Sequence, residues 1–378
     1  MKRLAIFLDG TWNTLNNNTN VWRLKSLCAK MADQFVYYSQ GVGTRYGEKI
    51  RGGILGYGID NEIIDAYTWL IQNFNKGDEI FIFGFSRGAY TARSLSGLIT
   101  KCGILRLGAP LSIEQLYDRY RQGSARQRID QLLRAATPSS FTLEEQWLVR
   151  YSMPTQIKLV GVWDTVGSLG LAFESIRRKV QKYRFLDTHL YRNNQFAFHA
   201  LALDEHRRSF EPTFWTRTVP KGQPGSPPRP LDQVEQRWFI GAHANVGGGY
   251  ASDLLAQAPL KWLMDKASAA GLAFTSGLDI DTSNAAPPIA DSYGQFAYGL
   301  YKYISQPFYR PVGTPPMVGT QATTNRINET IDASVFERWR ADPAYRPGNL
   351  VDWAQRYSTD PAMLQTSVPA TDPGQTIH

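Results

Sequence analysis

The sequence of 378 residues has only two cysteines, Cys28 and Cys102. Their positions match no metal-binding or redox spacing, and a disulfide scaffold needs a much higher cysteine content. We therefore expect two free, buried thiols in a protein that folds under reducing conditions. Hydrophobic residues make up 43% and charged residues 20% of the chain, which excludes a disordered or collagen-like protein and predicts a packed globular one.

Long apolar runs are also missing. The longest are short segments such as residues 80–83, far below the roughly 18 residues that a membrane-spanning helix needs. The N-terminal sequence MKRLAIFLDG has two basic residues and then only five apolar ones before Asp9, too few for the core of a Sec signal peptide. We therefore expect a protein made in the cytoplasm without a Sec signal.

Acidic residues are fewer than basic ones, 33 against 41, which gives a formal net charge of +8. This excess favours anionic partners, and the sequence has no nucleic-acid-binding motif, so we expect no nucleic acid. A basic run at 177–184 and an aromatic stretch at 293–309 would suit peripheral contact with an anionic membrane. A solvated helix face and ordinary core packing explain these two segments equally well.

Short β-rich segments alternate with helical patterns along the chain. Near-continuous apolar strands are typical of a sheet covered on both faces, and the alternation predicts an α/β fold. We expect a mostly parallel central sheet flanked by helices, of the α/β-hydrolase type. The predicted strands are residues 4–8, 35–38, 79–85, 157–163 and 237–240, and the clearest predicted helices are residues 61–74 and 87–102.

The domain organisation follows from where this alternation is interrupted. We expect a single α/β-hydrolase domain over residues 1–341. Its helical or loop lid insertions are expected at about 105–150, 172–198 and 285–320. Residues 342–378 are polar and contain proline, and this composition predicts a C-terminal tail or strap.

One strand-to-helix junction carries a nucleophile motif. The apolar run at 79–85 leads into Gly84-Phe85-Ser86-Arg87-Gly88, a G-x-S-x-G sequence, and a helix rich in Ala and Ser follows at once. In such a turn the serine adopts a strained backbone, and the two glycines leave room where a Cβ would clash. We therefore predict Ser86 as a nucleophile, with Gly84 and Gly88 shaping its turn.

A serine nucleophile needs a histidine base and a carboxylate that orients this base. Of the five histidines, His243 follows a predicted strand and opens a glycine-rich loop, and Asp164 ends another predicted strand. The chain order Ser86, Asp164, His243 is that of the α/β-hydrolases. The alternatives are His199 as base, although its apolar, helically spaced context predicts a core histidine, and Asp204 as acid. In that case Asp164 would only cap its turn.

Backbone amides at two places are candidates for an oxyanion hole. The helix that begins at Arg87 points its first N–H groups and positive dipole end at the nucleophile. The sequence DGTWN at 9–13 follows the first strand and offers the amide of Gly10 or Thr11. Asp9 also permits a metal-binding reading, but no second carboxylate lies at ligand spacing, so we expect neither metal nor cofactor.

Together these motifs resemble a known family. The motifs are DGTWN, GVGT, GDEIFIFGFSRGAYTARSL, GVWDTVGSLG, HALALDEHRRSF and GAHANVGGGY, spread over roughly residues 3–250. They are similar to those of the uncharacterised α/β-hydrolase domain family that includes the type VI secretion phospholipase effectors. Matched motif by motif, the family's nucleophile falls on Ser86, its acid on Asp164 and its base on His243. One position departs from the family's His-x-Asp-Val-Gly-Gly-Gly loop, because the chain has Asn245 there.

The resemblance implies hydrolysis of the acyl esters of membrane phospholipids through an acyl-enzyme, after delivery into the periplasm of a rival bacterium. It also implies secretion-apparatus and immunity proteins as partners. Two alternatives stay open. The chain is then either a serine esterase that acts on a soluble ester or acylated glycan, or a catalytically silent binding or adaptor module of the same fold.

Overall fold

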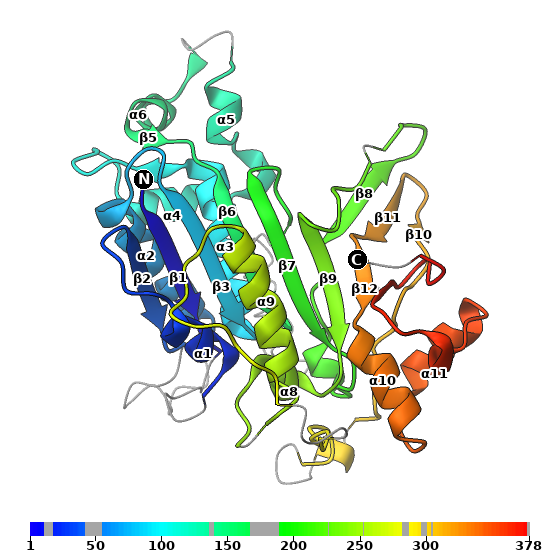
Figure 1. The fold of residues 1–378 in the computed structure, drawn as a ribbon. Helices are drawn as coiled ribbons and strands as arrows, with labels where there is room; N and C mark the ends of the chain where they lie inside the picture. Colours follow the sequence, from blue (N-terminus) through cyan, green and yellow to red (C-terminus); the bar gives the residue numbers. More distant parts are fainter. Residues whose placement is uncertain are drawn as a thin grey trace.

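In the computed structural model the chain is an α/β protein built around one large sheet (Figure 1). The structure describes residues 1–10, 18–41, 55–135, 140–166, 189–225, 227–251, 253–281, 287–295, 301–303 and 305–375. None of the helices in these ranges is long and apolar enough to cross a membrane. Both cysteines are free and buried, as predicted.

Eight strands of the described chain form the large sheet, in the order β13-β12-β9-β7-β6-β3-β1-β2. The pairs are parallel, except that β13 lies antiparallel to β12 at one edge. The order reverses at β1, which has β2 on one side and β3 on the other, and open α/β sheets place their sites beside such a reversal. The predicted mostly parallel α/β sheet is therefore confirmed. The strands are β1 (Arg3–Leu8), β2 (Gln34–Ser39), β3 (Glu79–Phe85), β6 (Ile157–Trp163), β7 (Asn194–Ala202), β9 (Val234–Phe239), β12 (Glu329–Ile331) and β13 (Val368–Pro369).

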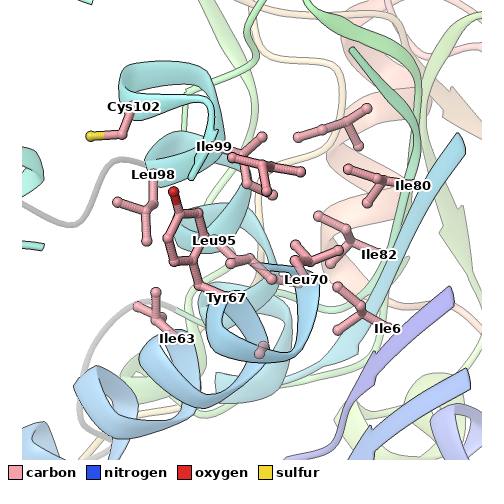
Figure 2. Packing of buried hydrophobic residues seen from close by; sticks show 14 of the residues in the cluster. Ile6, Ile63, Tyr67, Leu70, Ile80, Ile82, Leu95, Leu98, Ile99 and Cys102 are labelled. Atoms are coloured by element: carbon pink, nitrogen blue, oxygen red, sulfur yellow. The ribbon is translucent and has the colours of Figure 1, made fainter. Parts of the chain in front are cut away.

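Helices cover both faces of the sheet, as Figure 1 shows. Helices α1 (Asn20–Leu27) and α9 (Gln257–Ala269) pack on one face, and α2 (Leu55–Asn73) and α3 (Arg87–Cys102) pack on the other. Successive side chains of a strand point to opposite faces, so Ile6 packs with α2 and α3 while Phe7 packs with α1 and α9. Figure 2 shows the cluster under α2 and α3, which contains Ile6, Ile63, Tyr67, Leu70, Ile80, Ile82, Leu95, Leu98, Ile99 and Cys102.

Short helices follow α3 in the region predicted as an insertion at 105–150. These are α4 (Ile113–Arg121), α5 (Ile129–Leu132) and α6 (Leu143–Tyr151), with the 3-10 turn η3 (Gly123–Ala125). Capping boxes start α4 and α6: Ser112 pairs with Gln115, and Thr142 pairs with Glu145. The short strands β4 (Ile104–Leu105) and β5 (Ser152–Met153) pair across the base of this region.

A second sheet lies beyond the large one (Figure 1). Its order is β10-β11-β8, from β10 (Met317–Val318), β11 (Ala322–Arg326) and β8 (Thr216–Pro220), and both pairs are antiparallel. This sheet occupies part of the predicted insertion at 285–320 and joins it to the loop after β7. The remaining short turns are η6 (Arg208–Phe210), η8 (Tyr301–Tyr303) and η9 (Pro361–Met363).

Strand β7 corrects two expectations. His199 lies in this central strand and not in a helical segment, and the strand begins at Asn194, inside the insertion predicted at 172–198. Central strands of a parallel sheet are buried on both faces and read as continuous apolar runs. The period of the apolar residues therefore did not distinguish strand from helix here.

The segment predicted as a polar tail or strap at 342–378 is part of the core instead. Helix α11 (Gly348–Arg356) packs beside α10 (Ala333–Ala341), and β13 closes the large sheet. Trp353 is fully buried, stacks on Phe336 and donates its indole N–H to Ala370 O (2.7 Å). The polar composition led to the wrong prediction of a tail because α11 buries only one of its faces.

We expect Trp353→Ala to lower the free energy of unfolding by about 3–5 kcal/mol, because it leaves a large cavity in the core. Urea unfolding of purified protein measures this loss. The control is Met363→Ala, since Met363 is 77% exposed and its truncation should cost little. Equal, small effects of both changes would contradict the assignment of this segment to the core.

Candidate active site

Ser86 lies on the turn that joins β3 directly to α3. Its backbone has φ 58° and ψ −121°, a left-handed conformation that costs energy for any residue with a Cβ. The Ser86 N–H donates to Trp163 O (3.0 Å), which ties the turn to the end of β6. The hydroxyl is therefore held at the carboxyl edge of the sheet, next to the reversal of strand order.

The glycines on either side of Ser86 allow this turn to pack tightly. A Cβ on Gly84 would lie 2.4 Å from Gly88 O, and a Cβ on Gly88 would lie 2.2 Å from Leu8 O. Both contacts are with backbone, which cannot move aside easily. The turn thus lies directly against the end of β1, and this geometry agrees with the predicted role of the two glycines.

Three predicted side chains form a hydrogen-bonded row at this edge. Ser86 Oγ lies 2.8 Å from His243 Nε2, and His243 Nδ1 lies 2.5 Å from Asp164 Oδ2. Asp164 follows β6, and His243 begins the short helix α8 (His243–Gly247) after β9. A hydroxyl, an imidazole and a carboxylate in this row can pass the serine proton to the imidazole while the carboxylate orients the ring.

Asp164 is fully buried and each of its oxygens is hydrogen-bonded. Oδ1 accepts from the Ala202 N–H (3.1 Å) and from Arg310 Nη1 (2.7 Å). Oδ2 accepts from Arg310 Nη2 (3.0 Å), besides facing His243. Arg310 is itself fully buried, so this ion pair lies outside the reach of solvent. No sequence motif predicted a role for Arg310.

The protonation states of the row follow from these contacts. Burial raises the pKa of Asp164, but the Arg310 charge and the His243 hydrogen bond outweigh burial and hold this pKa well below its usual range. Burial lowers the pKa of His243, and the bond to Asp164 opposes this shift. A neutral imidazole then donates a hydrogen bond from Nδ1 to the ionised Asp164 carboxylate and accepts one at Nε2 from the Ser86 hydroxyl.

Aromatic rings hold the imidazole of His243 from two sides. Its centroid lies 4.7 Å from the ring of Phe85 and 4.9 Å from the ring of Phe210, which meets it edge to face. The His243 backbone N–H donates to Glu205 Oε2 (3.2 Å), and Glu205 forms a two-pronged ion pair with Arg207. The base is therefore fixed both at its ring and at its backbone.

The two alternative residues lie close to the row but outside it. His199 is fully buried; its Nε2 accepts from the Thr165 N–H (3.0 Å), and its Nδ1 faces Gln236 Oε1 (3.4 Å). Asp204 accepts from the Gly241 N–H (2.7 Å), just before His243 in the chain. These two residues thus brace the loops after β6 and β9, and they do not contact Ser86.

The backbone amides predicted for the oxyanion hole are only partly available in the structure. Arg87 opens α3 directly beside the nucleophile. The Gly10 N–H donates to Asp9 Oδ1 (2.7 Å), so this bond must open before the amide can serve an oxyanion. Thr11 lies outside the described residues. The carboxylate of Asp9 also accepts hydrogen bonds from the hydroxyls of Thr19 (2.5 Å) and Tyr38 (3.0 Å). These protein donors stabilise the negative charge of Asp9.

Asn245, the departure from the family motif, shapes the loop. Its Oδ1 accepts from the N–H groups of Ala242 (3.1 Å) and Ala290 (3.1 Å), and its Nδ2 donates to Asp253 Oδ1 (3.2 Å). An aspartate here would lose the donor and place a second carboxylate beside Asp253. The amide therefore fits this environment better than the usual carboxylate does.

Two comparisons with known sequences give matches. A family described as the catalytic domain of Tle1-like phospholipase effectors of the type VI secretion system (T6SS) matches residues 2–266. The uncharacterized protein YEL023C of Saccharomyces cerevisiae is 25% identical over 239 residues, which cover 57% of this chain and 33% of the yeast protein. The match thus spans only about a third of that relative's length.

Two solved structures are also similar. One is an uncharacterized protein from Pseudomonas aeruginosa, with 16% identity and a TM-score of 0.45 over 72% of this chain and 46% of that chain. The other is the Tle1 effector bound to the VgrG spike from the type VI secretion system, with 18% identity and a TM-score of 0.35. The second match covers 66% of this chain and 51% of that chain.

We expect His199 to make stability depend on pH. Burial and the nearby Arg93 charge lower its pKa to about 3, whereas an unfolded histidine titrates near 6.5. Below about pH 6.5 the unfolded chain therefore binds a proton that the folded chain does not bind, so acid destabilises the fold. The advantage of wild type over His199→Gln in free energy of unfolding should shrink by about 2 kcal/mol from pH 7 to pH 5, as measured by urea unfolding. A constant difference over this range would contradict the prediction.

Proposed function

Because the chain belongs to the family of Tle1-like phospholipase effectors of type VI secretion, matched over its catalytic domain, we propose that it hydrolyses the acyl esters of membrane phospholipids with Ser86 as nucleophile. The single observation that carries this proposal is the row of Ser86, His243 and Asp164 at the carboxyl edge of the sheet. The Ser86 turn has the strained backbone that a nucleophile motif of this kind needs.

In the proposed reaction, Ser86 Oγ attacks the acyl carbonyl carbon while His243 Nε2 takes the hydroxyl proton. Asp164 holds the ring through Nδ1 and stabilises the imidazolium. The Arg87 N–H at the start of α3 is the proposed donor to the carbonyl oxygen as it gains negative charge. The imidazolium then protonates the departing lysolipid oxygen, which leaves an acyl-enzyme. Water, deprotonated by His243, attacks this ester, and the imidazolium returns the proton to Ser86 Oγ as the acyl–Oγ bond breaks and the fatty acid leaves.

The substrate is proposed to lie in a bilayer, and surface features support this. The chain carries a net charge of +8, which favours an anionic interface. Tyr303 is 77% exposed and Tyr309 is 50% exposed, and tyrosine suits the boundary between membrane and water. Both belong to the aromatic stretch at 293–309. The basic run at 177–184 lies outside the described residues.

The family also suggests the setting of this activity. We propose that the chain is delivered by a type VI secretion apparatus into a target cell, where it reaches phospholipid. Its proposed protein partners are components of that apparatus and an immunity protein in the producing cell. Co-purification of the chain with secretion components from a producing bacterium tests the first of these partners.

We expect purified wild type to release fatty acid and lysophospholipid from anionic phospholipid vesicles, with the products identified by mass spectrometry. Ser86→Ala should lower this release by at least about 10³-fold, because the nucleophile is lost. The matched control is Ser94→Ala on the same helix, where a buried serine lies away from the row and release should stay near that of wild type.

Other outcomes of this experiment separate the alternatives. Hydrolysis of a soluble nitrophenyl ester without any lipid product would replace phospholipid by a soluble ester as the substrate. Equal release from wild type and Ser86→Ala would overturn the serine mechanism. Failure of Ser86 to react with a fluorophosphonate, together with no hydrolysis, would indicate a binding module.

A further inference from the structure

Arg310 forms a two-pronged ion pair with the candidate acid. Its Nη1 and Nη2 donate to the two oxygens of Asp164 at 2.7 Å and 3.0 Å. The same nitrogens donate to Ala202 O (2.7 Å) and to Phe210 O, so the guanidinium plane is fixed by the end of β7 and by η6. An end-on, two-pronged contact of this kind fixes the orientation of a carboxylate and stabilises its negative charge.

The position of Arg310 is itself determined by packing. The Phe308 N–H donates to His206 O (2.9 Å), and Val312 is buried against the C-terminal helices. Residues 308–312 therefore run between the loop after β7 and the cluster around α10 and α11. This places a full positive charge, shielded from water, directly behind the carboxylate that faces His243.

Other titratable groups near the row have partners of their own. Glu205 faces the His243 backbone and forms an ion pair with Arg207, whose guanidinium lies over the Phe210 ring. His199 faces Thr165 and Gln236. Among the ion pairs of the described residues, Arg310 is the one arginine or lysine that contacts the Asp164 carboxylate, so the orientation and charge of this carboxylate depend on it.

We propose that Arg310 is a positioning residue of the active site: it fixes the plane of the Asp164 carboxylate against the His243 ring and offsets its negative charge. This inference rests on the proposed function, since it requires that His243 acts as the base for Ser86. Arg310 does not contact the reacting atoms and acts only through Asp164.

The proposal has a consequence for pH dependence. An uncompensated Asp164 anion stabilises the imidazolium form of His243, and the Arg310 cation reduces this stabilisation. Loss of Arg310 should therefore raise the pKa of His243, so that the imidazole becomes a neutral base only at higher pH. The acidic limb of the rate profile should move up by about 1 pH unit or more. Loss of a merely structural contact would lower the rate or the stability and leave the limb in place.

The experiment measures the rate at which a fluorophosphonate labels Ser86 between pH 5 and pH 9, in the full chain, for wild type, Arg310→Gln and Arg310→Lys. We expect Arg310→Gln to move the acidic limb upward and to lower the rate at pH 7 at least about tenfold. Arg310→Lys keeps the charge but loses the two-pronged contact, so its limb should stay near that of wild type while its rate falls. Identical limbs in wild type and Arg310→Gln would overturn the proposal.

Two further measurements distinguish loss of the contact with Asp164 from a failure of the variant to fold. Arg119→Met removes another fully buried arginine, paired with Glu144 and remote from the row, and it should reduce stability without moving the limb. The double variant Asp164→Asn, Arg310→Gln removes both charges of the buried pair and should label at the same rate as Asp164→Asn alone. A further loss in the double variant would overturn a role through Asp164.

Failure of the inference is distinct from failure of the proposed function. If the fluorophosphonate labels wild type and the acidic limb of Arg310→Gln coincides with that of wild type, the inference alone is contradicted. Wild type that does not label contradicts the serine mechanism, and the inference fails with it. Release of lipid products is measured separately and decides the substrate class.

Discussion

The arrangement of the candidate site depends on one buried carboxylate. Taking the charge of Asp164 out of water is costly, and the fold offsets this cost with Arg310, the Ala202 N–H and the His243 ring. Each of these groups comes from a different part of the chain. Loops after β6, β7 and β9 therefore have to meet at a single point, and the parallel sheet brings them there because all three strands end at the same edge.

Local motifs allowed Ser86, Asp164 and His243 to be predicted from the sequence. Ser86 sits in a short pattern whose spacing itself encodes the turn, and Asp164 and His243 each follow an apolar strand. The structure places their side chains within hydrogen-bonding distance, while their catalytic roles stay predictions. The large parallel sheet was likewise predictable, since buried strands and helices alternate along the chain.

Residues whose meaning depends on distant partners were not predictable. Arg310 follows an aromatic stretch, and nothing near it in the sequence indicates a carboxylate 146 residues away. Strand β7 was missed because a doubly buried strand and a buried helix have the same apolar composition. The last segment was misjudged because Trp353 and Leu350 occupy one face of a helix whose other residues are polar. In each case burial was decided by tertiary contacts and not by local pattern.

The ion pair between Asp164 and Arg310 also has a consequence for the order in which the protein becomes complete. The two members of the pair are separated by 146 residues, and Ser86 and His243 are separated by 157. Contacts over such separations carry a large loop-closure cost and slow folding. While the chain emerges from the ribosome, Asp164 lacks the Arg310 counter-ion until residue 310 has been made. We therefore expect the row of Ser86, His243 and Asp164 to assemble as one of the last steps of folding, so that it is incomplete in nascent chains.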